Sequence, residues 1–206
     1  MLTYYFAKGS GALAAHILLE EIGAEYQTIP VSIPDKEHQS PDYLAINPKG
    51  RIPSLVTPQG VLTENPAILA YLAQTHPEAG LIPSDPWAFA KAQELNAYIA
   101  STAHIAFAHK QRGARWSDDP ETYPAMQAKV AENMRDCAEY VQAHYAFTPW
   151  VLGEGYTACD PYVFQLGRWV TASGLDLSDF PKLQAHAEQM RARPATQRAL
   201  AAHGLG

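Results

Sequence analysis

One stretch, residues 47–56, constrains the fold more than any other part of this chain; it reads Asn-Pro-Lys-Gly-Arg-Ile-Pro-Ser-Leu-Val. Pro53 stands at the start of a short apolar strand that we predict over 54–57. Because proline has no N–H to donate, a sheet tolerates it at a strand start or an edge. A cis bond between Ile52 and Pro53 would expose the backbone of Ile52, whose N–H and C=O could then pair with an extended peptide ligand. The alternative is an ordinary turn that leads into a strand.

A second motif, Glu64-Asn65-Pro66, follows another short strand that we predict over 61–63. Asn65 is a good N-cap residue, and Pro66 suits the first helical position, where its missing N–H costs nothing. A helix that begins there aims free N–H groups and the positive end of its dipole at whatever precedes it. A ligand carboxylate would suit that place, and the Glu64 carboxylate would suit a ligand ammonium.

The order of predicted elements completes the first part of the chain. We expect strands over 2–6, 26–31, 54–57 and 61–63, and helices over 12–22, 41–46 and 65–75. A strand-helix-strand start favours a parallel pair with a right-handed crossover. Proline and glycine are frequent over 76–86, which indicates a linker, and the chain after it is helical in character.

Taken together, these motifs resemble the glutathione-binding half of the glutathione S-transferases, most closely the bacterial beta class. The similarity extends through the chain, including Tyr4-Tyr5-Phe6, residues 13–17 and Thr157-Ala158-Cys159-Asp160. The resemblance implies the glutathione S-transferase fold, an α/β thioredoxin-like domain followed by an all-α domain. We expect the first domain over residues 1–77, a linker over 78–86 and the helical domain over 87–206.

Composition narrows the possible functions. The chain has 206 residues, 47% of them apolar, and a formal charge of −6, which argues against a general nucleic-acid binder. Its two cysteines, Cys137 and Cys159, make neither a disulfide framework nor a zinc motif, and the eight histidines form no ligand cluster, so no metal is expected. No apolar run reaches the ~18 residues of a membrane span, and no signal-peptide pattern is evident, so we expect a soluble cytoplasmic protein without a membrane partner.

The resemblance also implies which residues hold glutathione, which would be a co-substrate and not a cofactor. The implied glutathione-binding residues are Lys36, Arg51, Ile52, Pro53, Glu64 and Asn65. Lys36 would meet the glycine carboxylate of the ligand, although a solvated surface lysine is the alternative. Glu64 and Asn65 would answer the ammonium and the carboxylate of the γ-glutamyl end. Lys49 is expected to be exposed.

The residue that holds the thiolate is less certain from the sequence than the residues that hold the peptide. Beta-class enzymes carry a cysteine at the position that Gly11 occupies here, and this turn contains none. Covalent mixed-disulfide chemistry is therefore not expected. Ser10 is the first candidate for the thiolate donor and Tyr5 the second. Ser10 is equally expected to be the N-cap of the first helix.

A second-substrate pocket is implied in the helical domain, from His104, Phe107, Gln111 and Trp116. His104 ends a segment similar to the beta-class Y-I-A-T-E-L-H, but Ile105 replaces the lysine that follows it there. A packed core stripe would show the same spacing. We assign the Thr157 to Asp160 box to folding, as a variant of a capping box.

The leading function is conjugation of the glutathione thiolate to small hydrophobic electrophiles. The alternatives are a glutathione-dependent disulfide reductase or peroxidase, and a non-catalytic binding protein of the same fold. The physiological electrophile is not identifiable from spacing. The resemblance, together with the small residues of the long helix after Trp87, also predicts a homodimer, and it predicts a cis bond between Ile52 and Pro53.

Overall fold

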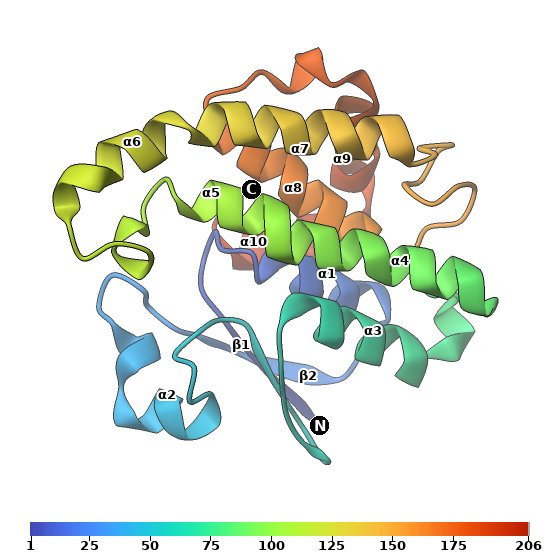
Figure 1. Ribbon diagram of the computed structural model, residues 1–206. Helices are drawn as coiled ribbons and strands as arrows, with labels where there is room; N and C mark the ends of the chain where they lie inside the picture. The colour runs from blue at the N-terminus through green and yellow to red at the C-terminus, as the bar shows by residue number, and fades with distance from the viewer. Residues whose placement is uncertain (206) are drawn as a thin grey trace. The chain divides into compact units, whose positions relative to one another are not determined.

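The computed structural model describes residues 1–205. This part of the chain forms two compact units: the first contains residues 1–82 together with 190–205, and the second contains residues 83–189 (Figure 1). Each unit is described by itself.

A four-stranded mixed sheet forms the centre of the first unit, in the order β2-β1-β3-β4. Its strands are β1 (Leu2–Phe6), β2 (Tyr26–Pro30), β3 (Ser54–Thr57) and β4 (Gly60–Thr63). The β1 and β2 strands pair in parallel, whereas β3 pairs antiparallel with both β1 and β4. This sheet confirms the predicted thioredoxin-like α/β domain.

Helices cover both faces of this sheet. They are α1 (Leu13–Glu21), α2 (Pro41–Ile46), α3 (Asn65–Thr75) and α10 (Pro194–Ala202). Side chains alternate along β1, so Tyr4 packs against His16 of α1 with 5.5 Å between ring centroids, and Tyr5 packs against Tyr43 of α2 at 5.8 Å. The α1 and α2 helices therefore lie on opposite faces.

The last helix, α10, packs against α1 within the first unit. Arg193, just before α10, donates from Nε and an Nη to the two carboxylate oxygens of Glu21, at 2.6 and 2.8 Å. The sequence analysis placed residues 87–206 in one helical domain. Segments this far apart in the chain are joined by side-chain complementarity, which a composition shift near residue 80 does not reveal.

The second unit is helical, as expected. Its helices are α4 (Pro86–Tyr98), α5 (His104–Ala108), α6 (Tyr123–Ala128), α7 (Val130–His144) and α8 (Asp160–Ala172), followed by α9 (Pro181–Ala192), which runs past residue 189. A π-helical turn, Ile99–Ala103, joins α4 to α5. The α8 helix is almost wholly buried and packs against α7.

The start of α8 is fixed by a buried carboxylate. Asp160 is fully buried and accepts hydrogen bonds from the backbone N–H of Val151 at 2.9 Å and of Thr157 at 2.7 Å. The Thr157 hydroxyl lies 3.1 Å and His186 Nε2 lies 2.9 Å from the same carboxylate. These contacts support the folding role that the sequence predicts for the Thr157 to Asp160 box.

Residues 1–205 contain neither a membrane-spanning helix nor a cluster of metal-ligating side chains. No described helix combines the length and apolarity needed to cross a membrane. Within the same residues, no group of three or more His, Cys, Asp and Glu side chains could hold a metal ion.

Candidate functional site

The end of the β3–β4 hairpin brings the two sequence motifs together. Ser54 pairs with Thr63, so Ile52 and Glu64 lie just beyond the same end of the hairpin. The bond from Ile52 to Pro53 is cis, as predicted. Within residues 1–205, neither the N–H nor the C=O of Ile52 has a hydrogen-bond partner. The hairpin end therefore presents one backbone donor and one acceptor that an extended ligand can use.

Two buried side chains hold the backbone that precedes this hairpin. The Tyr43 hydroxyl donates to the Arg51 carbonyl at 2.6 Å, and the Asn47 side-chain amide donates to the same carbonyl at 2.7 Å. Both groups also contact the Ser54 hydroxyl, at 2.9 and 3.2 Å. Burial raises the pKa of Tyr43. The sequence analysis gave these two residues no role, although Asn47 begins its central motif.

The loop that carries Lys36 is tied to the same segment. Gln39 donates from Nε2 to the Gly50 carbonyl at 3.3 Å, and Gly50 has a φ of +57°. The positive φ favours glycine at position 50, and a Cβ there would displace the Gln39 amide from its contact with this segment. Lys36 is exposed with a φ of +56°, and its position in this loop leaves its role a prediction.

Glu64 has an unusual backbone and a charged partner. Its φ is +71°, a region that costs a non-glycine residue on the order of 1–3 kcal/mol. Its carboxylate pairs with the Lys49 ammonium, which also donates to the Thr63 hydroxyl at 2.7 Å. Lys49 is exposed, as expected. It is also the cation that Glu64 holds in the free chain.

The structure corrects the role predicted for Asn65 as a cap. The α3 helix begins at Asn65 itself, and its N-cap is Glu64, whose side chain caps nothing. Asn65 is 7% exposed and donates from Nδ2 to the Gly11 carbonyl at 2.9 Å. Its Oδ1 has no partner among the described residues. The amide is used to tie the start of α3 to the β1–α1 turn, which explains why it is not available to cap.

Ser10 is not the N-cap of α1, contrary to the sequence prediction. The helix starts at Leu13 with Ala12 as its N-cap residue and no side-chain cap. The Ser10 hydroxyl donates to the Ala7 carbonyl at 2.8 Å and accepts from the Ala12 N–H at 3.2 Å. Ser10 therefore closes the turn before the helix and lies two residues before the N-cap residue, Ala12.

The two tyrosines of β1 have different environments. Tyr4 is fully buried and its hydroxyl donates to the Ala12 carbonyl at 2.5 Å. Burial raises its pKa well above the ordinary value, so Tyr4 stays protonated. Tyr5, the second candidate for a thiolate donor, is half-buried against Tyr43 of α2. Its hydroxyl is not committed to any contact within residues 1–205.

A buried relay of side chains supports the turn that contains Ser10. The Gly9 N–H donates to His203 Nδ1 at 3.2 Å, His203 Nε2 lies 3.1 Å from His16 Nδ1, and His16 Nε2 lies 3.1 Å from the Tyr26 hydroxyl. That hydroxyl donates to the Glu20 carboxylate.

Only one proton arrangement satisfies every member of this relay. The Gly9 N–H can only donate, so His203 Nδ1 accepts and the His203 proton is on Nε2. That N–H donates a hydrogen bond to His16 Nδ1, so the His16 proton is on Nε2, which donates to the Tyr26 hydroxyl. Both imidazoles are then neutral. Burial lowers the pKa of His16 to about 4, which agrees with this arrangement. Sequence reasoning missed the pair because His16 and His203 are 187 residues apart.

The four residues predicted to line a second-substrate pocket fall into separate groups. His104 stacks on Trp169 with 4.7 Å between ring centroids, and Phe107 lies 5.7 Å from the same indole. Trp116 stacks instead on His109 at 4.1 Å. Gln111 lines a cavity described below. Trp169 is the residue that organises the first group, and nothing in the sequence pointed to it.

Comparison with known proteins decides the family. Residues 1–74 match the family model described as Glutathione S-transferase, N-terminal domain. Glutathione S-transferase GstA of Escherichia coli O157:H7 is 33% identical over 205 residues, which cover 98% of each chain. The chain belongs to the glutathione S-transferase family. This confirms the predicted family and the assignment of the chain as a transferase.

Solved structures agree with this family. A glutathione transferase homologue from Sulfitobacter with bound glutathione is 40% identical, with a TM-score of 0.95 over 100% of this chain and 99% of that one. A bacterial beta class transferase from Sphingomonas chungbukensis is 27% identical, with a TM-score of 0.85 over 99% and 100% of the two chains. Maleylacetoacetate isomerase of Pseudomonas aeruginosa is 26% identical over 97% of this transferase and 95% of its own length.

Proposed function

We propose that this transferase binds glutathione at the end of the β3–β4 hairpin and conjugates its thiolate to small apolar electrophiles. The observation that carries the proposal is the unpaired backbone of Ile52, which lies at the same hairpin end as Glu64. A tripeptide-like ligand can extend along this backbone by strand addition. The homologue from Sulfitobacter, whose structure contains glutathione, supports this choice of ligand.

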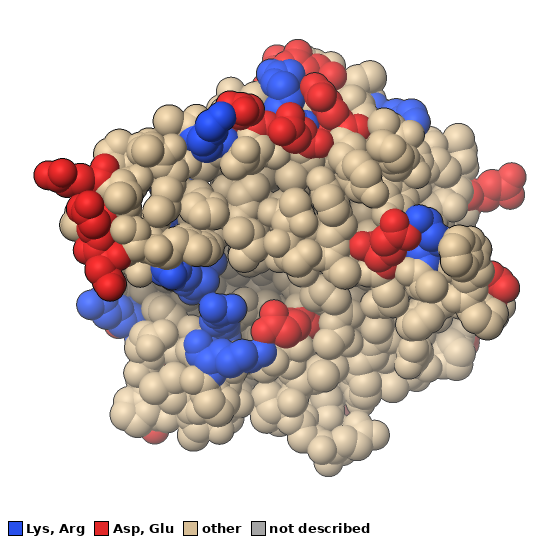
Figure 2. All heavy atoms as spheres, in the orientation of Figure 1, with Lys and Arg blue, Asp and Glu red and all other residues tan. Residues whose placement is uncertain are grey.

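The charges at the hairpin end suit the γ-glutamyl end of glutathione. Its ammonium replaces that of Lys49 on the Glu64 carboxylate, an exchange of one cation for another. Its carboxylate meets the first turn of α3, where the N–H groups of Asn65 and Ala67 make no bond within the helix. Figure 2 shows Lys and Arg side chains interspersed with Asp and Glu side chains on the face in view. Lys36 is proposed to meet the glycine carboxylate.

The thiolate is proposed to lie beside the turn that contains Ser10. In the free chain the Ser10 hydroxyl donates to the Ala7 carbonyl, so it must rotate to donate to sulfur. The N–H of Gly11 has no backbone partner within residues 1–205 and is a second donor at the same turn. Because no cysteine stands in this turn, the thiolate of glutathione itself performs the attack.

The variant Ser10→Ala tests this step. A hydrogen bond to a charged acceptor contributes roughly 1.5–3 kcal/mol, so its loss should raise the pKa of the bound thiol by roughly one to two units. Turnover near neutral pH should fall while glutathione affinity stays largely intact. The measurement is the thiolate absorbance of bound glutathione against pH.

The matched control for this experiment is Ser40→Ala, which removes the N-cap of α2, where Ser40 accepts from the Tyr43 N–H at 3.2 Å. It should lower stability without moving the thiol titration. An unchanged titration in Ser10→Ala would mean that the Gly11 N–H or Tyr5 is the donor to the thiolate.

An assay panel separates conjugation from its alternatives. Conjugation of a chromogenic aryl halide supports the proposal, reduction of a small disulfide supports a reductase, and glutathione binding without either supports a binding protein. Isomerisation of maleylacetoacetate belongs in the panel because a relative carries that isomerase name. Failure to bind glutathione would overturn the proposal altogether.

We also propose a homodimer and a cytoplasmic location, as the resemblance to the family predicts. Two-fold self-association is the commonest assembly of soluble proteins. One chain has a mass of 22.6 kDa, and light scattering at micromolar concentration should give twice that mass. A monomeric mass would contradict the proposal.

A further inference from the structure

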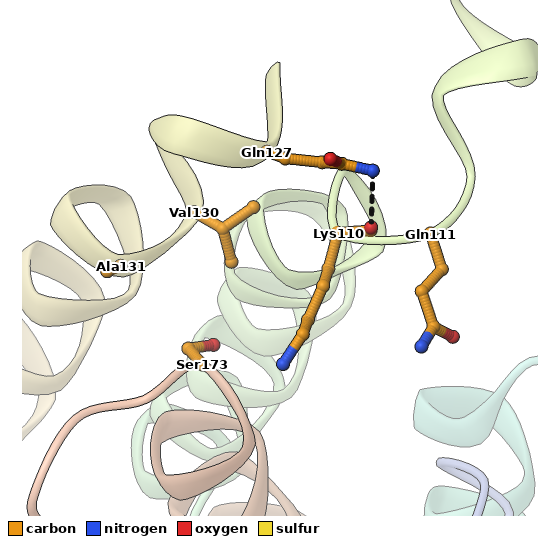
Figure 3. Close-up of a pocket in the computed structure, with 6 residues that line it drawn as sticks. All are labelled: Lys110, Gln111, Gln127, Val130, Ala131 and Ser173. Carbon is orange, nitrogen blue, oxygen red and sulfur yellow. Dashed lines mark hydrogen bonds between the residues drawn. The ribbon is translucent and has the colours of Figure 1, made fainter. Parts of the chain in front are cut away.

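A cavity of about 290 Å³ lies within the helical unit, beside the carboxyl end of α8 (Figure 3). It is lined by Lys110, Gln111, Gln127, Val130, Ala131 and Ser173. Lys110 and Gln111 follow α5, the next three belong to α6 and the start of α7, and Ser173 follows α8. The cavity therefore lies where segments from three parts of this unit converge.

Several polar groups of this lining have hydrogen-bond donors to spare. The Lys110 ammonium gives one N–H to the Ala172 carbonyl and has two others. The Gln111 amide has no partner within residues 1–205, and it extends in the same direction as Lys110 in Figure 3. Gln127 uses one N–H on the Lys110 carbonyl at 3.2 Å and has a second. The Ser173 hydroxyl donates to the Trp169 carbonyl of α8 at 2.8 Å.

The lining of the cavity carries one charge, which is positive. Lys110 is the one charged residue in the lining, and no Asp or Glu occurs between residues 95 and 117 of the sequence. The acid nearest to the lining in sequence is Glu132, and Lys129 pairs with it at 2.7 Å. Val130 and Ala131 supply an apolar wall. A cation, amide donors and an apolar wall together match a small organic acid, because a carboxylate only accepts hydrogen bonds.

We propose that this cavity binds small aryl or alkyl carboxylates, with Lys110 as the charge partner and Gln111 as an amide donor. The Val130 and Ala131 wall contacts the apolar body of the acid. The proposal is separate from the proposed function, because the cavity is complete within the helical unit and its occupation needs no glutathione.

Lys110 has a plain structural role that the experiment must separate from binding. Its contact with the Ala172 carbonyl caps the carboxyl end of α8, where cations are favoured. Lys182 makes the same kind of contact, to the Gln142 carbonyl at 2.8 Å in α7, and is not part of the cavity lining. Lys182→Met is therefore the matched control for Lys110→Met.

The experiment titrates benzoate and its neutral isostere benzamide into the full chain without glutathione, followed by calorimetry and by the side-chain amide resonances of Gln111 and Gln127. We expect saturable benzoate binding that shifts both resonances. Lys110→Met should weaken benzoate by roughly 10- to 100-fold and change benzamide by less than about twofold. Lys110→Arg should retain benzoate binding, and Lys182→Met should behave as the parent chain does.

Three results would overturn the proposal: no saturable benzoate binding, equal affinity for benzoate and benzamide, or unchanged benzoate affinity in Lys110→Met. If Lys110→Met lowers the melting temperature, the Lys110→Arg variant and the benzamide arm still test the charge. Because glutathione is absent throughout, these results do not depend on whether the chain conjugates it.

Discussion

The hairpin end of the first unit and the aromatic group around Trp169 in the second unit are held together by different kinds of contact. At the hairpin end, buried hydrogen bonds from Tyr43 and Asn47 fix a stretch of backbone. Around Trp169, His104 and Phe107 of α5 stack on a buried indole. Under the proposed function the first arrangement recognises a ligand by its peptide groups, whereas the second is held together by ring packing.

This difference explains how the two regions are encoded. Backbone recognition needs a few residue types at fixed spacing, such as the proline, glycine and asparagine of residues 47–53. An aromatic surface needs only large side chains on one side of a helix, and many sequences provide that. Variants that act in one region and spare the other test whether the division is real.

The largest effect is expected in the second unit, at the start of α8. Asp160→Ala leaves several buried donors without an acceptor, among them the N–H groups of Val151 and Thr157. The free energy of unfolding should fall on the order of 3–5 kcal/mol, measured by urea unfolding. Asp176→Ala removes an exposed contact to the Ser178 N–H and should cost much less. If both variants unfold alike, the α8 start is not what holds the helical unit together.

The next effect concerns the first unit and pH. His16 has a pKa of about 4 in the folded chain and about 6.5 when unfolded, so between these values only the unfolded chain takes up the proton. The stabilisation is complete above pH 6.5 and is lost as the pH falls toward 4, by as much as roughly 3 kcal/mol. Urea unfolding at pH 7.5 and 4.5 measures it. His16→Asn should lack this part of the pH dependence, and equal slopes in both chains would contradict the neutral relay.

A smaller effect should separate ligand charge from ligand shape. Glu64→Gln keeps the shape of the side chain but removes the charge that a ligand ammonium would meet. Because the Glu64 side chain is 58% exposed, we expect a loss of only about 1–2 kcal/mol, or roughly 5- to 30-fold in glutathione affinity by calorimetry. Lys49→Met should not weaken binding. If both variants lose affinity equally, the ion pair shapes the site and does not yield to the ligand.

The smallest effect is expected in the aromatic group. His104→Leu removes one ring stacked on Trp169, which is worth about 0.5–1.5 kcal/mol of stability. Glutathione affinity should not change, because no residue of the hairpin end is altered. Thermal unfolding and calorimetry measure the two quantities, and a loss of glutathione affinity would join the two regions that the comparison separates.

The sequence predicts the first unit better than the second, because the first unit is encoded by short motifs at fixed spacing. Local motifs predicted the four strands, the start of α3 near Asn65 and the cis bond before Pro53. The predicted caps failed for two reasons. Asn65 binds the Gly11 carbonyl, 54 residues away, and so does not cap, whereas Ser10 bonds within its own turn, two residues before the N-cap Ala12.

Contacts between distant segments were not predictable at all. His16 and His203 meet only because α10 returns to α1, and a lone histidine on a helix carries no signal of its partner. The residues predicted for the second-substrate pocket share a helical stretch, but stacking divides them between Trp169 and His109. Helical spacing predicts which side chains share a face of a helix, but it does not predict which partner each of them contacts.

The return of α10 to the first unit has a consequence for how the chain is made. Residues 83–189 of the helical unit leave the ribosome before His203, which the Gly9 turn requires as its acceptor. At ~5–20 residues per second, the wait between residue 82 and residue 203 is on the order of ten seconds. During that time the helical unit has its full set of residues, whereas the sheet that was synthesised first does not. Completion of the two units therefore runs opposite to their order of synthesis, and the nascent β1–α1 turn acquires its bond to His203 only after all of residues 83–189 have been made.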